Sequence, residues 1–284
     1  MSDAQDPLRV EIRDGIAHVT VDAPPMNLLG ASIFGALHPL VEQLEQDDST
    51  RVVVLRSADP DFFIAHGDVE TIAGVPVVPA PNVTELPFTH QILERWRKLP
   101  QITIAQVEGF ARGGGSEVTL VCDMRFAATG KAVFGQPEVA LGILPGAGGT
   151  ARLTRLLGAA RASEIILGGD DFSAEEAERY GWINRALPPA ELGPFVDRLA
   201  LRIASYPKQT LRETKRTIQR ISGENIERDL LTEQRAFDRL MSDPRSERVE
   251  RMQRFLDRGV QTPDGERGLA FACTQLGFEE GDEP

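Results

Sequence analysis

The sequence predicts an α/β fold that is followed by a helical C-terminal region. Apolar runs typical of buried strands, such as 52–55 and 102–107, alternate with segments whose apolar residues recur at helical spacing. After Pro189 the strand signals stop and only amphipathic helical patterns follow. We therefore expect three parts, which are an α/β core with the active site at 1–189, a helical region at 190–260 and a mobile acidic tail at 261–284.

Composition excludes several classes of function. The 284 residues carry a net charge of −12, and such an acidic field repels nucleic acid. Cys122 and Cys273 are the only cysteines, which favours a reducing, cytoplasmic compartment over a disulfide-bonded one. The polar N-terminus has no apolar signal core, and no apolar run approaches the roughly 20 residues of a membrane helix. We expect a cytoplasmic protein that binds neither nucleic acid nor membranes.

The first element in the chain is a predicted β-hairpin. Val10 and Ile12 alternate with polar residues, and a second β-rich run covers 16–21. Asp14-Gly15 between them is typical of a two-residue hairpin turn.

A loop, a helix and a buried strand are predicted next. The loop at 24–27 contains two prolines, and the apolar spacing over 33–44 indicates a helix. The wholly apolar run 52–55 predicts a strand covered on both faces. A loop at 59–69 follows, and the proline-rich segment 73–87 indicates an irregular surface flap.

The central feature of the chain is a strand, a glycine run and a helix in succession. A predicted helix at 91–99 leads into the strand at 102–107, and the glycines 113–115 then precede a helix that begins near Glu117. This order directs unpaired N–H groups at one point, which suits negative charge developing on an oxygen. A glycine run can equally be only a tight connection. The phosphate-loop and dinucleotide spacings are absent.

The remaining elements of the predicted core are short. Strands are expected at 125–128 and 132–134, followed by a turn at 135–138 and a second glycine-rich turn at 144–150. A helix is expected to follow this turn, with Leu153 on its apolar face. Ser173 and Glu176 indicate a capping box at the start of the next helix, and 183–187 indicates a last strand. Beyond Pro189, four amphipathic helices are expected at 192–203, 208–221, 224–241 and 246–258, whose apolar faces suit core packing and leave room for subunit contacts.

Four motifs together resemble the crotonase superfamily, the enoyl-CoA hydratase/isomerase family, over about residues 10–258. They are Gly-Phe-Ala-Arg-Gly-Gly-Gly-Ser-Glu at 109–117, Cys-Asp at 122–123, Phe-Gly-Gln-Pro-Glu at 134–138 and the glycine-rich segment 141–153. The resemblance implies a crotonase-like spiral of repeated ββα units with a C-terminal helical trimerisation region, which also covers the active site. It implies acyl-CoA thioester substrates and a homotrimer or a dimer of trimers.

The resemblance also implies a site. Its oxyanion hole corresponds to the backbone N–H groups of Gly67 and Gly114, and its two hydratase glutamates correspond to Glu117 and Glu138. Such donors stabilise an enolate, and two carboxyl groups of different protonation can divide the proton transfers. Gly146 matches the position that leaves room for water. The residues expected to contact the substrate or its CoA part are Met26, Ala65, His66, Asp68, Val69, Gly113, Pro137 and Gly146.

The expected activity is syn hydration of a 2-enoyl-CoA, because both glutamates are present and family isomerases generally keep a carboxylate only at the position of Glu138. No metal and no cofactor are expected, since coenzyme A is part of the substrate. The alternatives are a Δ3-Δ2-enoyl-CoA isomerase, a specialised crotonase-fold enzyme of secondary metabolism, or a non-catalytic acyl-CoA-binding protein.

One position departs from the family pattern. The usual Ala-Gly-Ala-Asp is Ala65-His66-Gly67-Asp68 here, so a bulky histidine stands where glycine is expected. The backbone either tolerates His66 or the pocket is reshaped for another acyl group. A surface histidine without a role is the third possibility.

Overall fold

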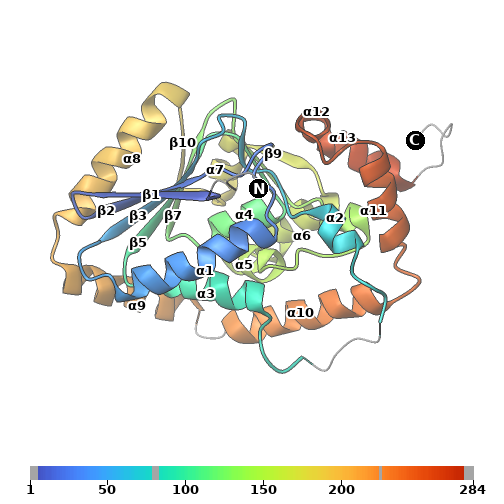
Figure 1. Cartoon of the computed structure of the whole chain (residues 1–284), viewed down its shortest axis with the longest axis horizontal. Helices are drawn as coiled ribbons and strands as arrows, with labels where there is room; N and C mark the ends of the chain where they lie inside the picture. Colours follow the sequence, from blue (N-terminus) through green and yellow to red (C-terminus); the bar gives the residue numbers. More distant parts are fainter. Residues whose placement is uncertain (1–5, 79–82, 224–225, 278–284) are drawn as a thin grey trace.

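Two β-sheets with helices on both sides make up the chain in the computed structural model, which describes residues 6–78, 83–223 and 226–277 (Figure 1). The large sheet has the strand order β1-β2-β3-β5-β7-β10, and the small sheet has the order β4-β6-β8-β9. The strands of the large sheet are β1 (Leu8–Arg13), β2 (Ile16–Val21), β3 (Val52–Ser57), β5 (Ile102–Val107), β7 (Met124–Ala128) and β10 (Arg185–Leu187).

The predicted hairpin is confirmed at the edge of the large sheet. β1 and β2 pair antiparallel, and Asp14 and Gly15 between them have φ of 53° and 74°. Both residues are left-handed, as the twist of a two-residue hairpin turn requires. All other pairings in this sheet are parallel, from β2 with β3 to β7 with β10.

The small sheet arises from a repeated unit. Each of β3, β5 and β7 is followed by a short strand of the small sheet and then by a helical turn. These short strands are β4 (Phe62–Ile64), β6 (Phe110–Arg112) and β8 (Val133–Gly135), which run parallel, and β9 (Asp171–Ser173) pairs antiparallel with β8. The expected spiral of ββα units is therefore confirmed, and each turn of the spiral ends at the same edge of the small sheet.

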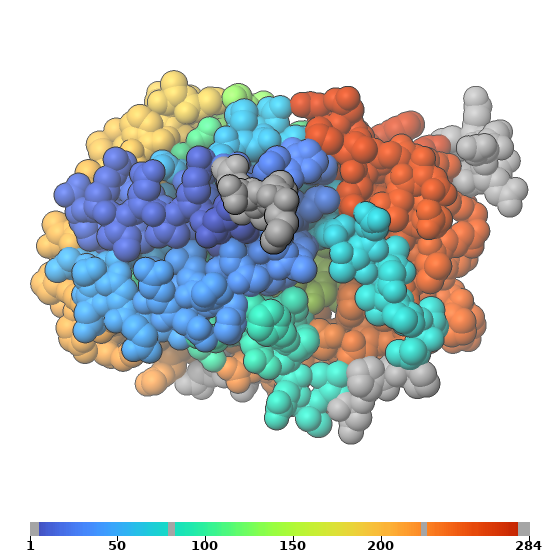
Figure 2. Space-filling model, viewed as in Figure 1, coloured from blue at the N-terminus to red at the C-terminus, as the bar shows by residue number. Residues whose placement is uncertain are grey.

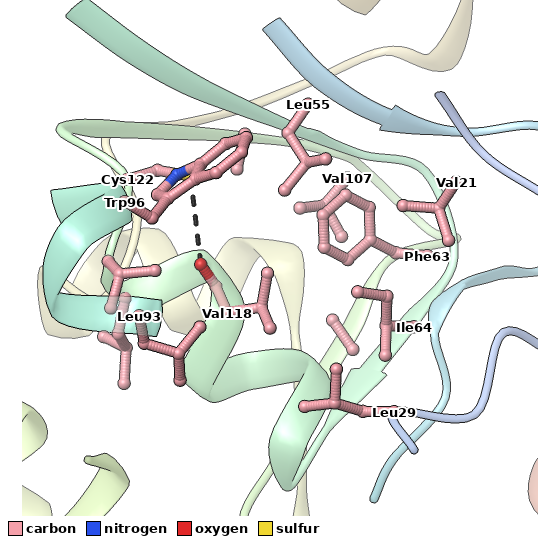
Figure 3. Close-up of a cluster of buried hydrophobic side chains, with 14 of the residues drawn as sticks. Val21, Leu29, Leu55, Phe63, Ile64, Leu93, Trp96, Val107, Val118 and Cys122 are labelled. Carbon is pink, nitrogen blue, oxygen red and sulfur yellow. Dashed lines mark hydrogen bonds between the residues drawn. The ribbon is translucent and has the colours of Figure 1, made fainter. Parts of the chain in front are cut away.

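Helices cover both faces of the large sheet. On one face α1 (Ala31–Gln46), α3 (Phe88–Lys98) and α4 (Gly114–Leu120) pack against side chains of β2, β3 and β5. Figure 3 shows this core, in which Leu93 and Trp96 of α3 lie close to Val118 and Cys122, whose thiol donates to the Val118 carbonyl. The buried apolar side chains of these helices hold α4, and with it the glycine run at its N-terminus.

The other face of the large sheet is covered by α8 (Pro189–Ala204), whose apolar side chains pack on those of β2, β3, β5 and β7. The helical region expected from residue 190 therefore begins with a helix that packs on the α/β core. Apolar residues of the sheet's second face need a covering layer, and α8 supplies it (Figure 1).

The remaining helices follow the predicted order with additions. Ser173 and Glu176 form the expected capping box at the start of α7. The start expected at 224 for the third C-terminal helix lies outside the described residues. The bounds are α2 (Val69–Ala73), η1 (Glu138–Leu141), α5 (Gly149–Leu157), α6 (Ala159–Gly168), α7 (Ala174–Tyr180), α9 (Lys208–Gly223), α10 (Ile226–Ser242), α11 (Arg248–Asp257), α12 (Pro263–Arg267), α13 (Leu269–Thr274) and η2 (Gln275–Gly277).

The prediction of a mobile tail from residue 261 is wrong as far as Gly277. The segment 261–277 forms α12, α13 and η2, and it buries Leu269, Cys273 and Leu276 against Met252 and Phe255 of α11. In Figure 2 this part of the chain (red) lies on the side of the molecule next to the residues around α2 (cyan). The acidic residues at 278–284 lie outside the described residues. None of the helices in the described ranges combines the length and the apolarity that crossing a membrane requires.

Candidate active site

Three loops converge on one cavity because three parallel strands of the small sheet end at the same edge. β4, β6 and β8 lead into the segments 65–68, 113–117 and 136–138, and residues of all three line a cavity of about 570 Å³. The rest of its wall is mainly apolar and comes from distant parts of the chain. It includes Leu29, Phe34, Ile72, Phe88, Leu141, Ile143, Leu144, Phe237, Phe255 and Leu269.

Two backbone amides of the first two loops have no acceptor within the described part of the chain. The Leu29 amide donates to the His66 carbonyl at 2.8 Å, so the Gly67 N–H, on the opposite side of the same trans peptide, points away from Leu29. The Gly114 N–H belongs to the first turn of α4, where amides have no partner within the helix. A Cβ on Gly114 would lie 3.3 Å from the Gly67 nitrogen, so the two glycines are neighbours. Two adjacent free amides can bind an oxyanion.

Glycine is required at two positions of the central turn. Gly113 has a φ of +45°, and a Cβ there would lie 2.7 Å from Oε1 of Glu138. A Cβ on Gly115 would lie 1.9 Å from the Ile64 carbonyl oxygen. The glycine run therefore allows α4 to approach both the first loop and the Glu138 side chain.

Glu117 lies in the first turn of α4 and is buried, with 3% exposure. Its Oε1 accepts hydrogen bonds from the amides of Ala147 at 2.7 Å and Gly149 at 2.8 Å. Burial, followed by the negative charge of Glu233, raises the pKa of Glu117 to about 7, and the two amides oppose this rise. A carboxyl group with such a pKa can take up or release a proton near neutral pH.

Glu138 begins η1 and faces the same cavity with 9% exposure. Burial, followed by the charge of Glu117, raises the pKa of Glu138 well above its usual range. With its side-chain nitrogen turned to Glu138, Gln136 donates to Oε1 and Oε2 at 3.1 and 3.0 Å and accepts from Ser116 at 3.2 Å. An ionised Glu138 suits this orientation, whereas a protonated Glu138 can donate to the oxygen of Gln136. The two carboxyl groups thus differ in surroundings although they share one cavity.

His66 is buried, with 3% exposure, so the possibility that it is a surface histidine is wrong. Its Nδ1 lies 2.6 Å from the Gly67 carbonyl oxygen, and its Nε2 lies 3.1 Å from a carboxylate oxygen of Glu266. The ring also packs edge-on against Phe255 with centroids 5.8 Å apart. The residue that departs from the family pattern is covered by the C-terminal segment.

The structure brings most of the expected site residues together. Those that line the cavity are His66, Gly67, Asp68, Val69, Gly113, Gly114, Glu117, Pro137, Glu138 and Gly146. Met26 and Ala65 do not line it, because both are fully buried and the Ala65 amide donates to the Met26 carbonyl at 3.2 Å. The expected role of these two residues in binding the substrate or its CoA part therefore stays a prediction.

Other residues of the site were not expected from the sequence. Phe237 of α10 lies against Gly146, and Glu233 of the same helix accepts from the amides of Gly148 and Ala151, both at 2.7 Å. The sequence signal that could have identified Glu233 is its place three positions after Leu230, which puts a charged residue on the apolar face of the helix. Among the described residues, no group of three or more His, Cys, Asp and Glu side chains is placed to hold a metal ion.

Comparisons with known proteins agree with this geometry. The family model described as enoyl-CoA hydratase/isomerase matches residues 11–262. A short-chain-enoyl-CoA hydratase of Clostridium acetobutylicum is 32% identical over 80% of this chain and 86% of its own length. A crotonyl-CoA hydratase of Syntrophomonas wolfei is 31% identical over 82% and 89%.

Two solved structures show the likeness of the fold. A crystal structure from Streptomyces avermitilis has a TM-score of 0.86 and 37% identity, and it covers 97% of this chain and 100% of that one. An enoyl-CoA hydratase from Bacillus anthracis has a TM-score of 0.70 and 30% identity, with 89% and 96% covered.

Proposed function

Because the chain belongs to the enoyl-CoA hydratase/isomerase family of the crotonase superfamily, we propose that it catalyses the syn hydration of a 2-enoyl-CoA thioester. The family is enzymatic, and relatives at about 30% identity are named enoyl-CoA hydratases. The observation that carries the proposal is the arrangement of Glu117 and Glu138. Two buried carboxyl groups face one cavity beside the two free amides of Gly67 and Gly114.

The proposed chemistry assigns one task to each group. The amides of Gly67 and Gly114 donate to the thioester carbonyl oxygen. These two hydrogen bonds draw electron density away from C3 and stabilise the enolate. Ionised Glu117 removes a proton from water as the water oxygen bonds to C3. Protonated Glu138 gives its proton to C2 as the enolate collapses. Water and thioester thus supply all atoms of the product, and one proton must pass from Glu117 back to Glu138 before the next turnover.

The different surroundings of the two carboxyl groups support this division. The pKa of Glu117 is raised to about 7, which leaves a substantial ionised fraction near neutral pH, and two amides hold the ionised form. Glu138 accepts no hydrogen bond from the backbone amide of another described residue, and burial and its neighbour Glu117 raise its pKa well above the usual range. Addition of water across a double bond requires one group that accepts a proton and one that donates a proton, and these two carboxyl groups can take those roles.

The CoA part is proposed to bind near Asp68, Val69 and Pro137, which line the cavity, with the acyl chain against the apolar wall. No cofactor is needed, because the reaction transfers only a proton and hydroxide.

Two substitutions test the proposal. Glu117→Gln and Glu138→Gln should each lower kcat for crotonyl-CoA hydration by about 10²- to 10⁴-fold, since each removes one proton-transfer group and keeps its volume. Glu164→Gln is the control, because this carboxylate is exposed and, among the described residues, accepts a hydrogen bond only from the Tyr180 hydroxyl. Near-normal turnover in either site variant would remove the assignment.

Product analysis separates hydration from isomerisation. We expect hydration of crotonyl-CoA to the 3-hydroxyacyl thioester to have a higher kcat/KM than isomerisation of a 3-enoyl-CoA to the 2-enoyl-CoA. The reverse ranking would favour the isomerase, which needs only one carboxyl group at the position of Glu138.

We also propose a homotrimer or a dimer of trimers. Ile218 and Ile221 of α9 support it, because they are 61% and 82% exposed on one helix and large apolar side chains seldom cluster at a free surface. Light scattering should give three or six times the 31.1 kDa of one chain, and a monomer would contradict the proposal.

A further inference from the structure

The C-terminal segment, residues 261–277, contacts both loops of the proposed oxyanion hole. α12 and α13 lie on the same side of the molecule as α11 (Figure 1), and α13 packs in one apolar cluster with α11 and α2. Leu269 of the segment lines the cavity. The segment is therefore part of the wall of the site.

The first contact is made by Gln261 at the start of the segment. Its Oε1 accepts from the Val69 amide at 2.7 Å, and its Nε2 donates to Oδ1 of Asp68 at 3.0 Å. Asp68 and Val69 directly follow Gly67. Gln261 thus holds the first loop on the C-terminal side of the oxyanion glycine.

The second contact is made by Glu266, whose side chain is fully buried. Oε1 accepts from Nη1 of Arg112 at 2.5 Å, and Oε2 lies 3.1 Å from Nε2 of His66. The Glu266 carbonyl also accepts from Arg112 at 2.7 Å. One carboxylate therefore hydrogen-bonds to Arg112, two residues before Gly114, and lies within ion-pair distance of His66, directly before Gly67.

Both partners of Glu266 lie close in sequence to an oxyanion glycine. The peptide between His66 and Gly67 carries the oxyanion N–H, and the His66 ring lies 2.6 Å from the carbonyl oxygen of the following peptide, so the ring contacts the backbone on the far side of Gly67. Arg112 ends β6, two residues before Gly114, and its other partner is Asp171 of β9, at 2.6 Å for both nitrogen–oxygen pairs. The backbone also links the His66 loop to Arg112, whose amide donates to the Ala65 carbonyl at 2.9 Å, and Glu266 adds a contact between the two side chains.

Oxyanion stabilisation depends on where the donors are before the reaction starts. Amides that are held at the right separation stabilise the developing charge without reorganisation, and small displacements weaken this effect. The two amides here come from separate strands, whose pairing shows a register shift between Phe62 and Ile64. The Arg112 amide donates to the Ala65 carbonyl at 2.9 Å, and the buried carboxylate of Glu266 adds a side-chain link beside this backbone bond.

We propose that Glu266 is a positioning residue for the oxyanion hole, which holds the loops of Gly67 and Gly114 at a fixed separation through His66 and Arg112. The proposal rests on the proposed function, in that it assumes a thioester carbonyl bound by these two amides. It assigns to the C-terminal segment a part in the chemistry besides closing the cavity.

The test compares Glu266→Ala with Glu266→Gln in the full chain. Asp264→Asn is the matched control, because Asp264 is on the same helix, is 99% exposed and contacts only Arg267 within the described chain. Three quantities are measured for each variant. They are kcat for crotonyl-CoA, the dissociation constant of CoA without an acyl group, and the red shift of the absorbance of a bound 2,4-dienoyl-CoA, which reports polarisation of its carbonyl group.

We expect Glu266→Ala to lower kcat by about 10- to 100-fold and to reduce the red shift, with CoA affinity little changed. Glu266→Gln should retain more of both, because its amide keeps the volume and can still accept from Arg112. The control should match the wild type. This pattern, in a variant that keeps its circular dichroism spectrum, supports positioning.

Two outcomes would overturn the proposal. One is a folded Glu266→Ala variant with wild-type kcat and red shift. The other is a parallel loss of kcat, CoA affinity and melting temperature in both variants while the red shift per bound ligand stays unchanged, since Glu266 would then act on stability alone.

The red shift also separates this proposal from the proposed function. A wild-type protein that shifts the dienoyl absorbance but does not hydrate crotonyl-CoA would contradict the hydratase assignment, and the Glu266 variants would still be judged by the shift. A wild-type protein that binds the probe without any shift would overturn the role of Glu266 as well.

Discussion

Glu117 and Glu233 accept hydrogen bonds from alternate amides of one loop. Oε1 of Glu117 binds the amides of Ala147 and Gly149, whereas Glu233 binds those of Gly148 and Ala151. Two buried carboxylates are thus separated only by the backbone at the start of α5. The amides allow the pair to coexist, and the remaining repulsion helps to raise the pKa of Glu117 to about 7.

Glu233→Gln should therefore move the acidic limb of the pH profile of kcat/KM to lower pH. The charged groups that act on Glu117 are Glu233, which raises its pKa, and Arg152, which lowers it, and Glu138 shares its cavity. Removal of the Glu233 charge leaves Glu117 easier to ionise. The control is Glu227→Gln, on the same helix but 60% exposed. An acidic limb that stays in place in a folded variant would show that Glu233 does not tune Glu117.

Glu117→Gln should raise the melting temperature above that of the wild type at pH 8 to 9. The pKa of Glu117 is raised from 4.5 to about 7 in the folded chain, so the folded state holds a proton that the unfolded state has lost between these values. The associated stability is present below pH 4.5 and is lost as the pH rises through about 7. The ionised side chain then costs on the order of 3 kcal/mol, which the glutamine avoids. Differential scanning calorimetry at several pH values measures the difference, which should shrink toward pH 5. A difference that is constant with pH would contradict the raised pKa.

Gly114→Ala should lower kcat more than Gly67→Ala does. A Cβ on Gly114 would lie 2.8 Å from Leu29 and 3.3 Å from the Gly67 nitrogen, so it would push the two amides apart. A Cβ on Gly67 would meet only Ile72, at an ordinary 3.7 Å, and its backbone is not left-handed. We expect a loss of about 10²-fold for Gly114→Ala and less than about tenfold for Gly67→Ala, from steady-state kinetics. Equal losses would mean that the two glycines are not neighbours as described.

Gly109→Ala should destabilise the fold without acting on the site directly. A Cβ there would lie 1.9 Å from the Asp61 carbonyl oxygen, where the chain enters β6 beside β4. Relief of this overlap requires the backbone to move, at a cost of about 1–3 kcal/mol or more. Gly193→Ala in α8 is the matched control, since its Cβ would meet only Gln106 at 3.8 Å and should add about 0.5–1 kcal/mol of helix stability. Urea unfolding of both variants tests the contrast, and equal midpoints would contradict it.

The amino-acid sequence alone was sufficient for the elements whose signal is local. The hairpin at Asp14-Gly15, the buried strand at Val52–Ser57 and the capping box of Ser173 with Glu176 were predicted and are confirmed. Periodicity and turn chemistry act within a few residues, so these elements can be recognised without knowledge of the rest. The motifs that resemble the family likewise identified the fold.

Of the short strands of the small sheet, β8 was predicted at 132–134, whereas the other three were not recognised. β4, β6 and β9 have three residues each, too few for an alternating pattern to show. They exist because neighbouring strands supply their hydrogen bonds, and they bring Gly67 and Gly114 together. The expectation of a free tail from residue 261 failed for a related reason. Leu269, Cys273 and Leu276 become buried only against α11, which a search for periodicity within the tail cannot reveal.

The sequence therefore determined the kinds of groups available to the site, namely two glutamates, glycine amides and a histidine in an unusual place. Tertiary structure alone decided their state. Burial raises the pKa of Glu117 and Glu138, Glu233 reaches the same loop from α10, and Glu266 reaches His66 from α12. The physical reason is that desolvation and charge–charge interaction depend on distance in space, and these partners are separated along the chain by tens to hundreds of residues.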